Sequence, residues 1–302
     1  MTSTLRLGQI LKGSLSSYTI TKQLQDSVYL ATNLTGEKSI IKSVHHWRLE
    51  NERDVLRRFQ DRAPGLRPLV DDTERGGDAE EAPTIVLKWF EDDALNASGR
   101  RRFTRMMWEY WCWMYAYERV DIKPDNILVN YNPLVEFDPK STRISTARLA
   151  DLGNTVPNDS EYARNGFPIG VPIFRSPEAA LRLPWGCSTD IWSLGTTLIS
   201  LIWGLNFHLF KPPVPADHEE YELEILMKHC QYFGPYPLSY KDLANLETQN
   251  VLAEAEISKE DKDFLGKMML LDPRDRLTAT ELLMDEWFED PGDDFPSGNR
   301  ST

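Results

Sequence analysis

The segment Asp121-Ile-Lys-Pro-Asp-Asn126, followed by the apolar residues Ile127-Leu-Val129, is the most informative part of this 302-residue chain. Alone, such a segment could be a charged turn that arose by chance. Four further segments follow it in order along the chain: Ala150-Asp-Leu-Gly153, Ser176-Pro-Glu178, Thr189-Asp-Ile-Trp-Ser-Leu-Gly195 and Asp272-Pro-Arg-Asp-Arg276. Asp151 lies 25 residues after Asn126, and Glu178 lies 27 residues after Asp151. Because chance supplies one such segment but not five in this order, the set indicates a single shared chemistry.

These segments resemble, in order and spacing, those of the eukaryotic serine/threonine protein kinases. The resemblance implies that Asp121 orients the substrate hydroxyl and accepts its proton, and that Lys123 neutralises the phosphate in transfer. It also implies that Asn126 and Asp151 bind Mg²⁺, a hard cation that takes oxygen ligands.

Two further features of the resemblance lie in the second half of the chain. Glu178 is expected to pair with Arg276, as the corresponding glutamate and arginine of the family do. The extension Asp151-Leu-Gly-Asn154 is similar to the SR-protein kinases, and the closest resemblance is to fungal kinase-like proteins related to them.

Most residues that match the family's nucleotide-binding residues lie in the first ninety positions. Lys42, in Ser39-Ile-Ile-Lys42, matches the strand lysine that binds the α- and β-phosphates of ATP, and Glu52 matches its helix partner. Each alone could be a surface charge, and the order and spacing strengthen both. The resemblance places Val28 above the adenine, Leu128 beneath it, Leu87 as the gatekeeper, and the backbone from Lys88 to Phe90 as the hydrogen-bonding hinge.

Residue patterns predict strands first and helices later. Strands are expected near 18–21, 27–31, 39–44 and 84–90, with a turn at residues 33–37 and an amphipathic helix near 46–60. After Asp92 the pattern becomes helical, apart from short strands near 127–129 and 147–150. We therefore expect an α+β, two-lobed protein kinase fold. Its predicted parts are a β-rich N-lobe with an N-terminal extension (1–91), a larger helical C-lobe (92–289) and a disordered tail (290–302).

The sequence also departs from the family where a glycine-rich turn normally covers the phosphates. Only Gln25-Asp-Ser27 stands between Leu24 and Val28. Without glycine, backbone amides approach phosphates less closely, and Asp26 adds repulsion. We therefore expect weakened ATP binding.

Three other substitutions concern the adenine site and regulation. Ile40 replaces a small alanine against adenine and narrows the site. Arg119 and Val120 occupy the His-Arg positions before Asp121, and Val171 replaces a threonine that bonds the catalytic aspartate and lysine. Regulation by phosphorylation of the activation loop is therefore not expected.

The segment before the catalytic loop is short. Only 31 residues separate Trp89 from Asp121, where a short and a long helix with their connections need about 45. Its aromatic run from Trp108 is unlike the leucine-rich helix of the family. A mis-predicted splice junction and a genuine short helix filled by large aromatics both remain open, and the segment is expected to limit folding and activity.

Composition limits the kinds of partner and the cellular location that we expect. A net charge of −13 and the absence of a long apolar run argue against nucleic-acid binding and a membrane span. Three scattered cysteines, without a CxxC pair, are typical of reduced thiols in an intracellular protein, and no signal peptide is evident. We expect a monomer, cytoplasmic or nuclear, that acts on a protein substrate, with basic peptides compatible with the acidic surface.

Three function classes fit the residues to different degrees. The first is an ATP- and Mg²⁺-dependent protein serine/threonine kinase, favoured by Lys42, Asp121, Lys123, Asn126 and Asp151. The second is a pseudokinase that serves as an interaction module, favoured by the missing glycines, Val171 and the short segment. The third, a small-molecule phosphotransferase, is disfavoured because it usually lacks the lysine two residues after the catalytic aspartate. The substrate and pathway are not encoded in any motif.

Overall fold

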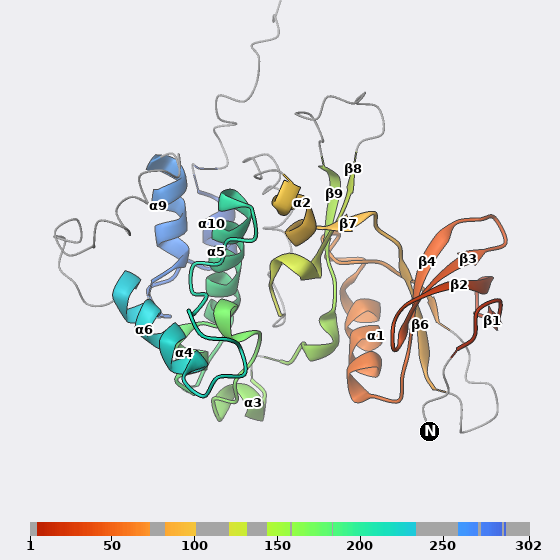
Figure 1. The fold of residues 1–302 in the computed structure, drawn as a ribbon, viewed down its shortest axis with the longest axis horizontal. Helices are drawn as coiled ribbons and strands as arrows, with labels where there is room; N and C mark the ends of the chain where they lie inside the picture. Colours follow the sequence, from red (N-terminus) through yellow and green to blue (C-terminus); the bar gives the residue numbers. More distant parts are fainter. Residues whose placement is uncertain are drawn as a thin grey trace, which may run out of the picture. The chain divides into compact units, whose positions relative to one another are not determined.

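The computed structural model describes residues 5–72, 82–100, 121–131, 144–157, 159–182, 184–233, 259–270, 273–285 and 287. The chain divides into two compact units, Met1–Asp93 with Asn126–Thr155, and Ala94–Asp125 with Val156–Thr302 (Figure 1). The predicted tail, the aromatic run from Trp108, Arg119, Val120 and Asp272 lie outside the described residues. The expected lobe boundary after residue 91 and the role of the short segment stay predictions.

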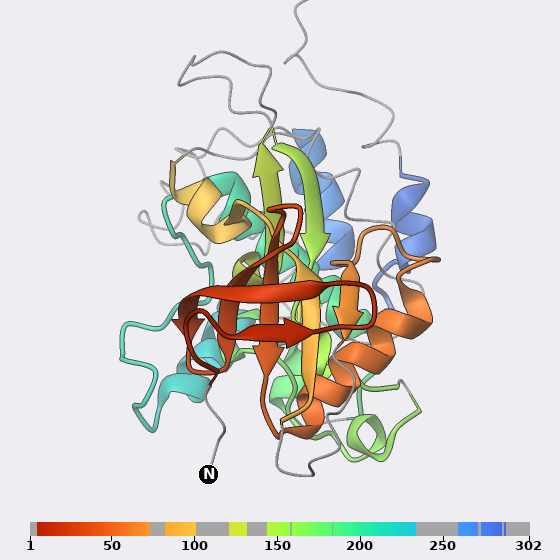
Figure 2. The same cartoon turned by 90° about the vertical axis from the view of Figure 1, so that its right-hand side faces the viewer.

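The first unit contains a six-stranded antiparallel sheet of order β1-β2-β3-β4-β6-β5. Figure 2 shows its first strands, in red, crossing in front of the later ones, so the sheet is strongly curled. The strands are β1 (Ile10–Lys12), β2 (Ser17–Gln25), β3 (Val28–Asn33), β4 (Lys38–Ser43), β5 (Leu69–Asp72) and β6 (Thr84–Lys88). A second sheet of order β7-β8-β9 joins β7 (Asp92–Asp93), β8 (Ile127–Tyr131) and β9 (Ile144–Leu149). The strands expected from the sequence are confirmed.

Alternation along the strands gives the large sheet two different faces. One face forms an apolar cluster made of Tyr18, Ile20, Tyr29, Ala31, Ile41 and Val86. The register pairs Val28 with Lys42 and Ile40 with Leu87. Because residues two apart share a face of a strand, Ile40 and Lys42 lie on the opposite face from the cluster.

Helix α1 (Trp47–Phe59) confirms the predicted amphipathic helix. It begins after His46, whose ring nitrogen accepts a hydrogen bond from the backbone of Arg48. Its buried residues, Leu49, Glu52, Val55, Leu56 and Phe59, recur every three or four positions, which is the spacing of one helix face. Glu52 is the charged exception on that face, so it needs a partner inside the unit.

The N-terminal extension is fastened by a buried carboxylate. Asp71 accepts hydrogen bonds from the backbone nitrogens of Ser14, Leu15 and Ser16 at 2.9–3.2 Å. It also accepts one at 3.0 Å from the hydroxyl of Tyr18. Burial and this contact raise the pKa of Tyr18 to about 12. The extension is therefore an integral part of the first unit.

The second unit is helical in its described residues. Its helices are α2 (Ala94–Arg100), α3 (Glu161–Arg164), α4 (Pro177–Ala180), α5 (Ser188–Trp203), α6 (Tyr221–Phe233), α9 (Lys259–Met268) and α10 (Ala279–Leu283). Helix α5 is the central one, because it is buried from Thr189 through Leu201 and packs against both α2 and α9. The α+β class, with a strand-rich first unit and a helical second one, is confirmed.

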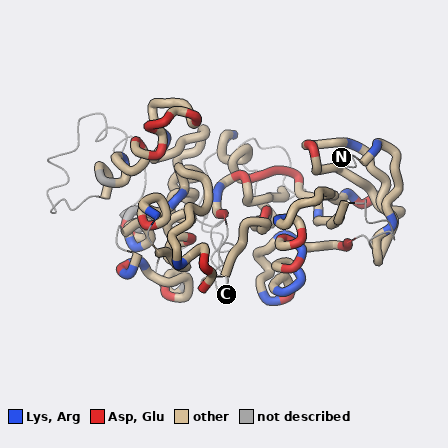
Figure 3. The backbone as a smooth tube through the Cα atoms, turned by 90° about the horizontal axis from the view of Figure 1, so that it is seen from below, with Lys and Arg blue, Asp and Glu red and all other residues tan. Residues whose placement is uncertain are grey.

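The distribution of charged residues and the lengths of the described helices bear on the partners expected from the sequence. Acidic and basic residues are interspersed along both units in Figure 3. Among the described helices, none is long and apolar enough to cross a bilayer.

Candidate active site

An ion pair links the large sheet to α1 inside the first unit. The Nζ atom of Lys42 lies 2.7 Å from one carboxylate oxygen of Glu52 and 3.1 Å from the other. The same amino group lies 3.3 Å from a carboxylate oxygen of Asp151. The side chain of Glu52 is 3% exposed, whereas that of Asp151 is 53% exposed. The pairing of Lys42 with Glu52 is thus formed, and about half of the Asp151 side chain remains accessible to solvent.

Asp151 is held in a constrained backbone conformation. It has φ 60° and ψ 57°, in the left-handed region, and it immediately precedes the 3₁₀ turn η4 (Leu152–Asn154). Aspartate tolerates this region better than most residues, and such local strain is concentrated at functional sites. Asp151 thus adopts this conformation where the chain passes from β9 into η4.

The turn after Asp151 is bound tightly to α1. The side-chain amide of Asn51 donates to the carbonyls of Gly153 at 3.1 Å and Thr155 at 2.8 Å. A β-carbon on Gly153 would lie 2.9 Å from the carbonyl oxygen of Arg48, so only glycine permits this approach. Leu152 is 1% exposed. Sequence reasoning missed Asn51, although it adjoins Glu52 on the helix.

The two expected Mg²⁺ ligands are brought together by a hairpin. The register pairs Ile127 with Leu149, and the nitrogen of Ala150 donates to the carbonyl of Asn126 at 2.8 Å. Asn126 therefore lies opposite the residue that precedes Asp151. One carboxylate and one amide oxygen suit Mg²⁺, which keeps several waters and takes further oxygens from phosphates. Among the described residues no group of three or more His, Cys, Asp or Glu could hold a metal.

The residues expected around adenine also lie in the first unit. Leu87 is fully buried and pairs with Ile40 across β4 and β6, while Val28 and Leu128 are half-buried. Phe90 is buried and Lys88 exposed.

The backbone at Lys88 has hydrogen-bond partners that no sequence motif predicted. Its nitrogen donates to the carbonyl of Pro68 at 3.0 Å, and its carbonyl accepts from the Nε atom of Arg67 at 2.9 Å. Arg67 stands in a loop with no periodic pattern, so nothing in the sequence marked it.

The hairpin that replaces the glycine-rich turn is as short as expected. Gln25 pairs with Val28, which leaves Asp26 and Ser27 as a two-residue turn. The hydroxyl of Tyr29 donates to the carbonyl of Asp26 at 3.2 Å. The turn is thus fixed from within the sheet, with an acidic side chain at its tip.

The expected catalytic loop lies in the second unit. Asp121 is 9% exposed, and the Nζ atom of Lys123 lies 3.9 Å from its carboxylate and 3.2 Å from that of Asp125. The hydroxyl of Thr197, on α5, donates to the carbonyl of Ile122 at 3.5 Å. Central helix and loop are therefore in direct contact.

Gly170 lies against Asp121, the expected catalytic aspartate. It has φ +73°, and a β-carbon there would lie 3.3 Å from an Asp121 carboxylate oxygen. Val171, which follows it, cannot donate the hydrogen bond that the family's threonine makes. Arg175 holds this stretch instead, since its guanidinium donates to the carbonyls of Ile169 at 3.0 Å and Gly170 at 2.9 Å. Arg175 also pairs with Glu222 at 3.2 Å, and sequence reasoning did not assign it a role.

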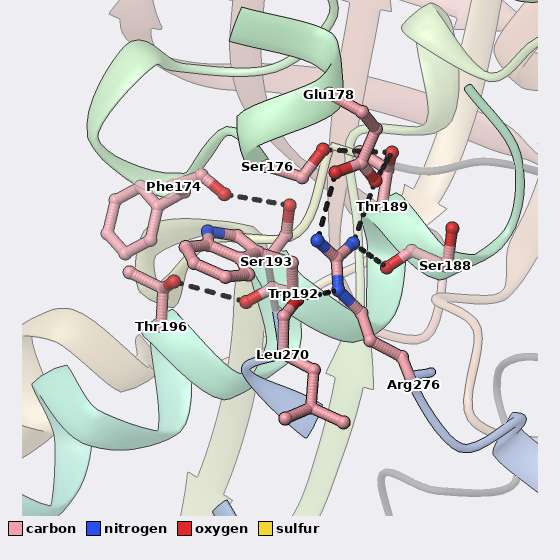
Figure 4. Close-up of polar contacts among 10 residues, drawn as sticks. All are labelled: Phe174, Ser176, Glu178, Ser188, Thr189, Trp192, Ser193, Thr196, Leu270 and Arg276. Carbon is pink, nitrogen blue, oxygen red and sulfur yellow. Dashed lines mark hydrogen bonds and ion pairs between the residues drawn. The ribbon is translucent and has the colours of Figure 1, made fainter. Parts of the chain in front are cut away.

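A second ion pair joins Glu178, in the segment Ser176-Pro-Glu178, to Arg276 (Figure 4). Arg276 binds Glu178 through two parallel hydrogen bonds of 2.7 and 2.9 Å. Its remaining donors reach the carbonyls of Ser188 at 2.9 Å and Leu270 at 2.7 Å, and the guanidinium lies 5.0 Å from the ring centre of Trp192. Thr189 donates to Glu178 at 2.8 Å. The expected pairing of Glu178 with Arg276 is confirmed.

The pKa of Glu178 reflects these contacts. Burial alone raises it, but the hydrogen bonds and positive charge of Arg276, with the Thr189 hydroxyl, outweigh burial and lower it below its usual value. Glu178 is therefore ionised throughout the neutral range.

Comparison with known proteins agrees with this geometry. The protein kinase domain family matches residues 112–288, more than half of the chain. The serine/threonine-protein kinase SKY1 of Saccharomyces cerevisiae is 32% identical over 167 residues, covering 47% of this chain and 22% of SKY1. Human serine/threonine-protein kinase DCLK3 is 29% identical over 173 residues, covering 57% of this chain and 22% of that protein. Human PAK 4 is 30% identical over 163 residues, covering 54% and 22%.

The match thus spans about a fifth of these relatives' own length. With an α+β fold, the paired Lys42 and Glu52 and the Glu178–Arg276 ion pair, this chain belongs to the protein kinase domain family and has its two-lobed fold.

Proposed function

We propose that this chain is a protein serine/threonine kinase, which transfers the terminal phosphoryl group of a nucleoside triphosphate to a protein hydroxyl. The observation that carries the proposal is the contact of Lys42 with both Glu52, at 2.7 Å, and Asp151, at 3.3 Å. A lysine paired in this way is positioned to bind the α- and β-phosphates, and protein kinases require the pairing for transfer.

Each residue has a role that its environment supports. Lys42 binds phosphate oxygens while Glu52 holds its amino group in place. Asn126 and Asp151 would hold Mg²⁺, which when bound neutralises charge on the phosphates. The family's usual phosphoryl donor is ATP, with Val28, Leu87, Lys88, Phe90 and Leu128 as the expected base-binding residues.

Asp121 and Lys123 act at the acceptor side. The carboxylate of Asp121 orients the substrate hydroxyl and takes its proton as the new phosphate ester bond forms. Lys123, at 3.9 Å from that carboxylate, balances its charge and that of the phosphoryl oxygens. The chain carries a net charge of −13, which favours basic protein substrates.

The test is phosphate transfer to a mixture of basic peptides, with Asp121→Asn as the variant. Removing the proton-accepting carboxylate should lower turnover about 100-fold or more, with nucleotide binding little changed. A variant that transfers phosphate as fast as the parent would show that Asp121 is not the catalytic base. Asp151→Ala should remove the Mg²⁺-dependent part of nucleotide binding and leave Mg²⁺-free binding unaltered.

A pseudokinase is the second candidate, and one observation favours it. The two-residue turn at Asp26 and Ser27 lacks the glycines whose backbone nitrogens cradle phosphates, and it adds a negative charge. A folded chain that binds no Mg²⁺-nucleoside triphosphate at millimolar concentration would establish this alternative.

A further inference from the structure

A buried arginine lies beside the backbone expected to recognise the nucleotide base. Arg67 is 7% exposed, and its Nε atom donates a 2.9 Å hydrogen bond to the carbonyl oxygen of Lys88. Arginine is almost never buried to this degree without polar partners. That carbonyl belongs to the first residue of the expected hinge, so one of its two lone pairs is already engaged.

The backbone fixes Arg67 on the nucleotide side of the sheet. Its nitrogen donates to the carbonyl of Leu149 at 2.8 Å, just before the segment that ends in Asp151. Leu69, two residues further on, pairs with Leu87. Alternate residues of an extended chain share a face, so Arg67 lies on the face of Leu69 and Leu87, which is also the face of Lys42.

The electrostatic surroundings agree with this placement. Burial lowers the pKa of Arg67 to about 10, and the negative charges of Glu52 and Asp151 offset part of that effect. These are the carboxylates that contact Lys42. The guanidinium remains protonated at neutral pH, and it has only hydrogen-bond donors and no acceptor.

We propose that Arg67 reverses the hydrogen-bonding preference of the base site, so that this chain favours a 6-oxopurine nucleotide, such as GTP or ITP, over ATP. The inference rests on the proposed function, because it assumes that a nucleoside triphosphate binds on this face. Adenine carries an amino group at position 6, which is a donor and needs an acceptor. Guanine and hypoxanthine carry an oxygen there, which is an acceptor.

The physical reason is that the 6-amino group of adenine and the guanidinium of Arg67 are both hydrogen-bond donors. In this chain the Lys88 carbonyl is shared with Arg67, and the guanidinium places additional N–H groups beside it. A 6-amino group would face these N–H groups and leave buried donors unpaired, which weakens binding by about tenfold or more. A 6-oxo group would accept a charge-assisted hydrogen bond from the guanidinium. Because the carbonyl keeps a second lone pair, a preference is expected rather than complete exclusion of ATP.

The experiment compares Mg²⁺ complexes of ATP, ITP, GTP and purine riboside triphosphate by calorimetry on the full chain. Relative to ATP, ITP carries an oxygen in place of the 6-amino group and a hydrogen on N1, and it lacks the 2-amino group of GTP, so this pair changes only the purine edge that Arg67 would meet. We expect ITP and GTP to bind more tightly than ATP by a factor of about ten or more. Purine riboside triphosphate should bind with an affinity between those of ITP and ATP. Equal affinities, or a preference for ATP, would overturn the proposal on the unaltered protein alone.

Two variants assign the preference to the side chain. Arg67→Met keeps the aliphatic stem but removes every donor, so the ratio of ATP to ITP affinity should rise at least tenfold. Arg67→Gln keeps a neutral N–H donor and should retain part of the preference. The matched control is Arg164→Met, at an exposed position of α3, which should leave the ratio unchanged. Melting temperatures without nucleotide establish that each variant is folded.

Failure of this inference and failure of the proposed function give different results. Nucleotide binding with the same ATP to ITP ratio in the parent and in Arg67→Met would overturn the inference and leave the proposed function standing. A parent that binds no nucleotide, together with an Arg67→Met variant that binds ATP, would show that the guanidinium only obstructs the site, and would also overturn it. No binding of any triphosphate to any folded variant would overturn both.

Discussion

Arg276→Met tests whether the buried ion pair with Glu178 holds the second unit together. Arg276 and Glu178 are 0% and 3% exposed in their side chains. The substitution keeps an apolar stem and removes the guanidinium, with its contact to the Trp192 ring. The two hydrogen bonds to Glu178 and those to the carbonyls of Ser188 and Leu270 are lost with it. It leaves a buried carboxylate whose described polar side-chain partner is the Thr189 hydroxyl.

The expected cost follows from the stranded charge. Removing one partner of a buried pair costs about 3–5 kcal/mol, mainly because the other charge stays buried without compensation. Against a typical net stability of about 5–15 kcal/mol, that loss is large enough to measure in urea denaturation. Arg276→Lys, which keeps the charge but not the parallel hydrogen bonds, should cost less.

The free energy of unfolding should depend on pH differently in the parent and in Arg276→Met. In the parent, the pKa of Glu178 is lowered, so its ionisation stabilises the fold above the ordinary carboxyl pKa, and that contribution is lost as pH falls through the lowered one. In Arg276→Met, burial outweighs the remaining hydrogen bonds, which include that of the Thr189 hydroxyl, and raises the Glu178 pKa. The variant should then lose stability as pH rises through the raised pKa, so the free-energy gap between parent and variant should be smaller at pH 5 than at pH 8.

Urea titrations of the parent, Arg276→Met, Glu178→Gln and the double variant complete a thermodynamic cycle. We expect the double variant to lose at least about 1.5 kcal/mol less than the sum of the single losses. The reasoning is refuted if the losses add within about 0.5 kcal/mol, or if the gap between parent and Arg276→Met does not shrink at pH 5. Arg164→Met, at an exposed site, serves as the control and should cost little.

Three further changes probe other contacts. His229 packs at 4.4 Å from the ring of Phe210, and burial, with the nearby positive Arg276, lowers its pKa to about 3. Protonation of the unfolded chain should therefore reduce stability by up to about 1.4 kcal/mol per pH unit below pH ~6.5, and urea midpoints of His229→Phe should show a weaker loss at acid pH. Gly170→Ala should reduce turnover in kinetic assays, because the added β-carbon contacts Asp121. Gly36, which has φ +83° and open space around it, is the control. Gly36→Ala should show only the backbone cost of about 1–2 kcal/mol, which melting measures. Asn51→Ala should loosen the turn after Asp151, and Mg²⁺-nucleotide affinity should fall severalfold, while an unchanged affinity would assign Asn51 to stability alone.

Much of the fold follows from local patterns that tertiary contacts do not overrule. The alternating residues of β3, β4 and β6, and the three-or-four-residue spacing in α1, predict these elements because each buries only one side. The carboxylates and cations of the candidate site could be proposed from the sequence for a different reason. Asp121, Asp151 and Lys42 stand in short motifs whose chemistry fixes the residue types, so a single sequence shows them.

The residues that sequence reasoning missed act through backbone groups. Asn51, Arg67 and Arg175 each donate to backbone carbonyl oxygens. The acceptors lie 102 and 104 residues along the chain for Asn51, 21 for Arg67, and 6 and 5 for Arg175. Any residue can supply a carbonyl, so the recipient leaves no mark in the sequence. Only the folded chain shows which polar side chains do this.

Several departures from the family pattern bear on nucleotide recognition, and this affects how activity should be assayed. The acidic two-residue turn and Ile40 depart from the family in the first unit, where the nucleotide is expected to bind, and the buried Arg67 lies in the same unit. The acceptor side retains Asp121 and Lys123, and Arg175 supports the segment beside them in spite of Val171. A chain that had lost phosphate transfer altogether would be under no chemical constraint to keep that acceptor side. Lack of transfer from ATP alone therefore does not distinguish a pseudokinase from a kinase with a different nucleotide preference, whereas transfer measured with ITP and GTP, in parent and Arg67→Met, does.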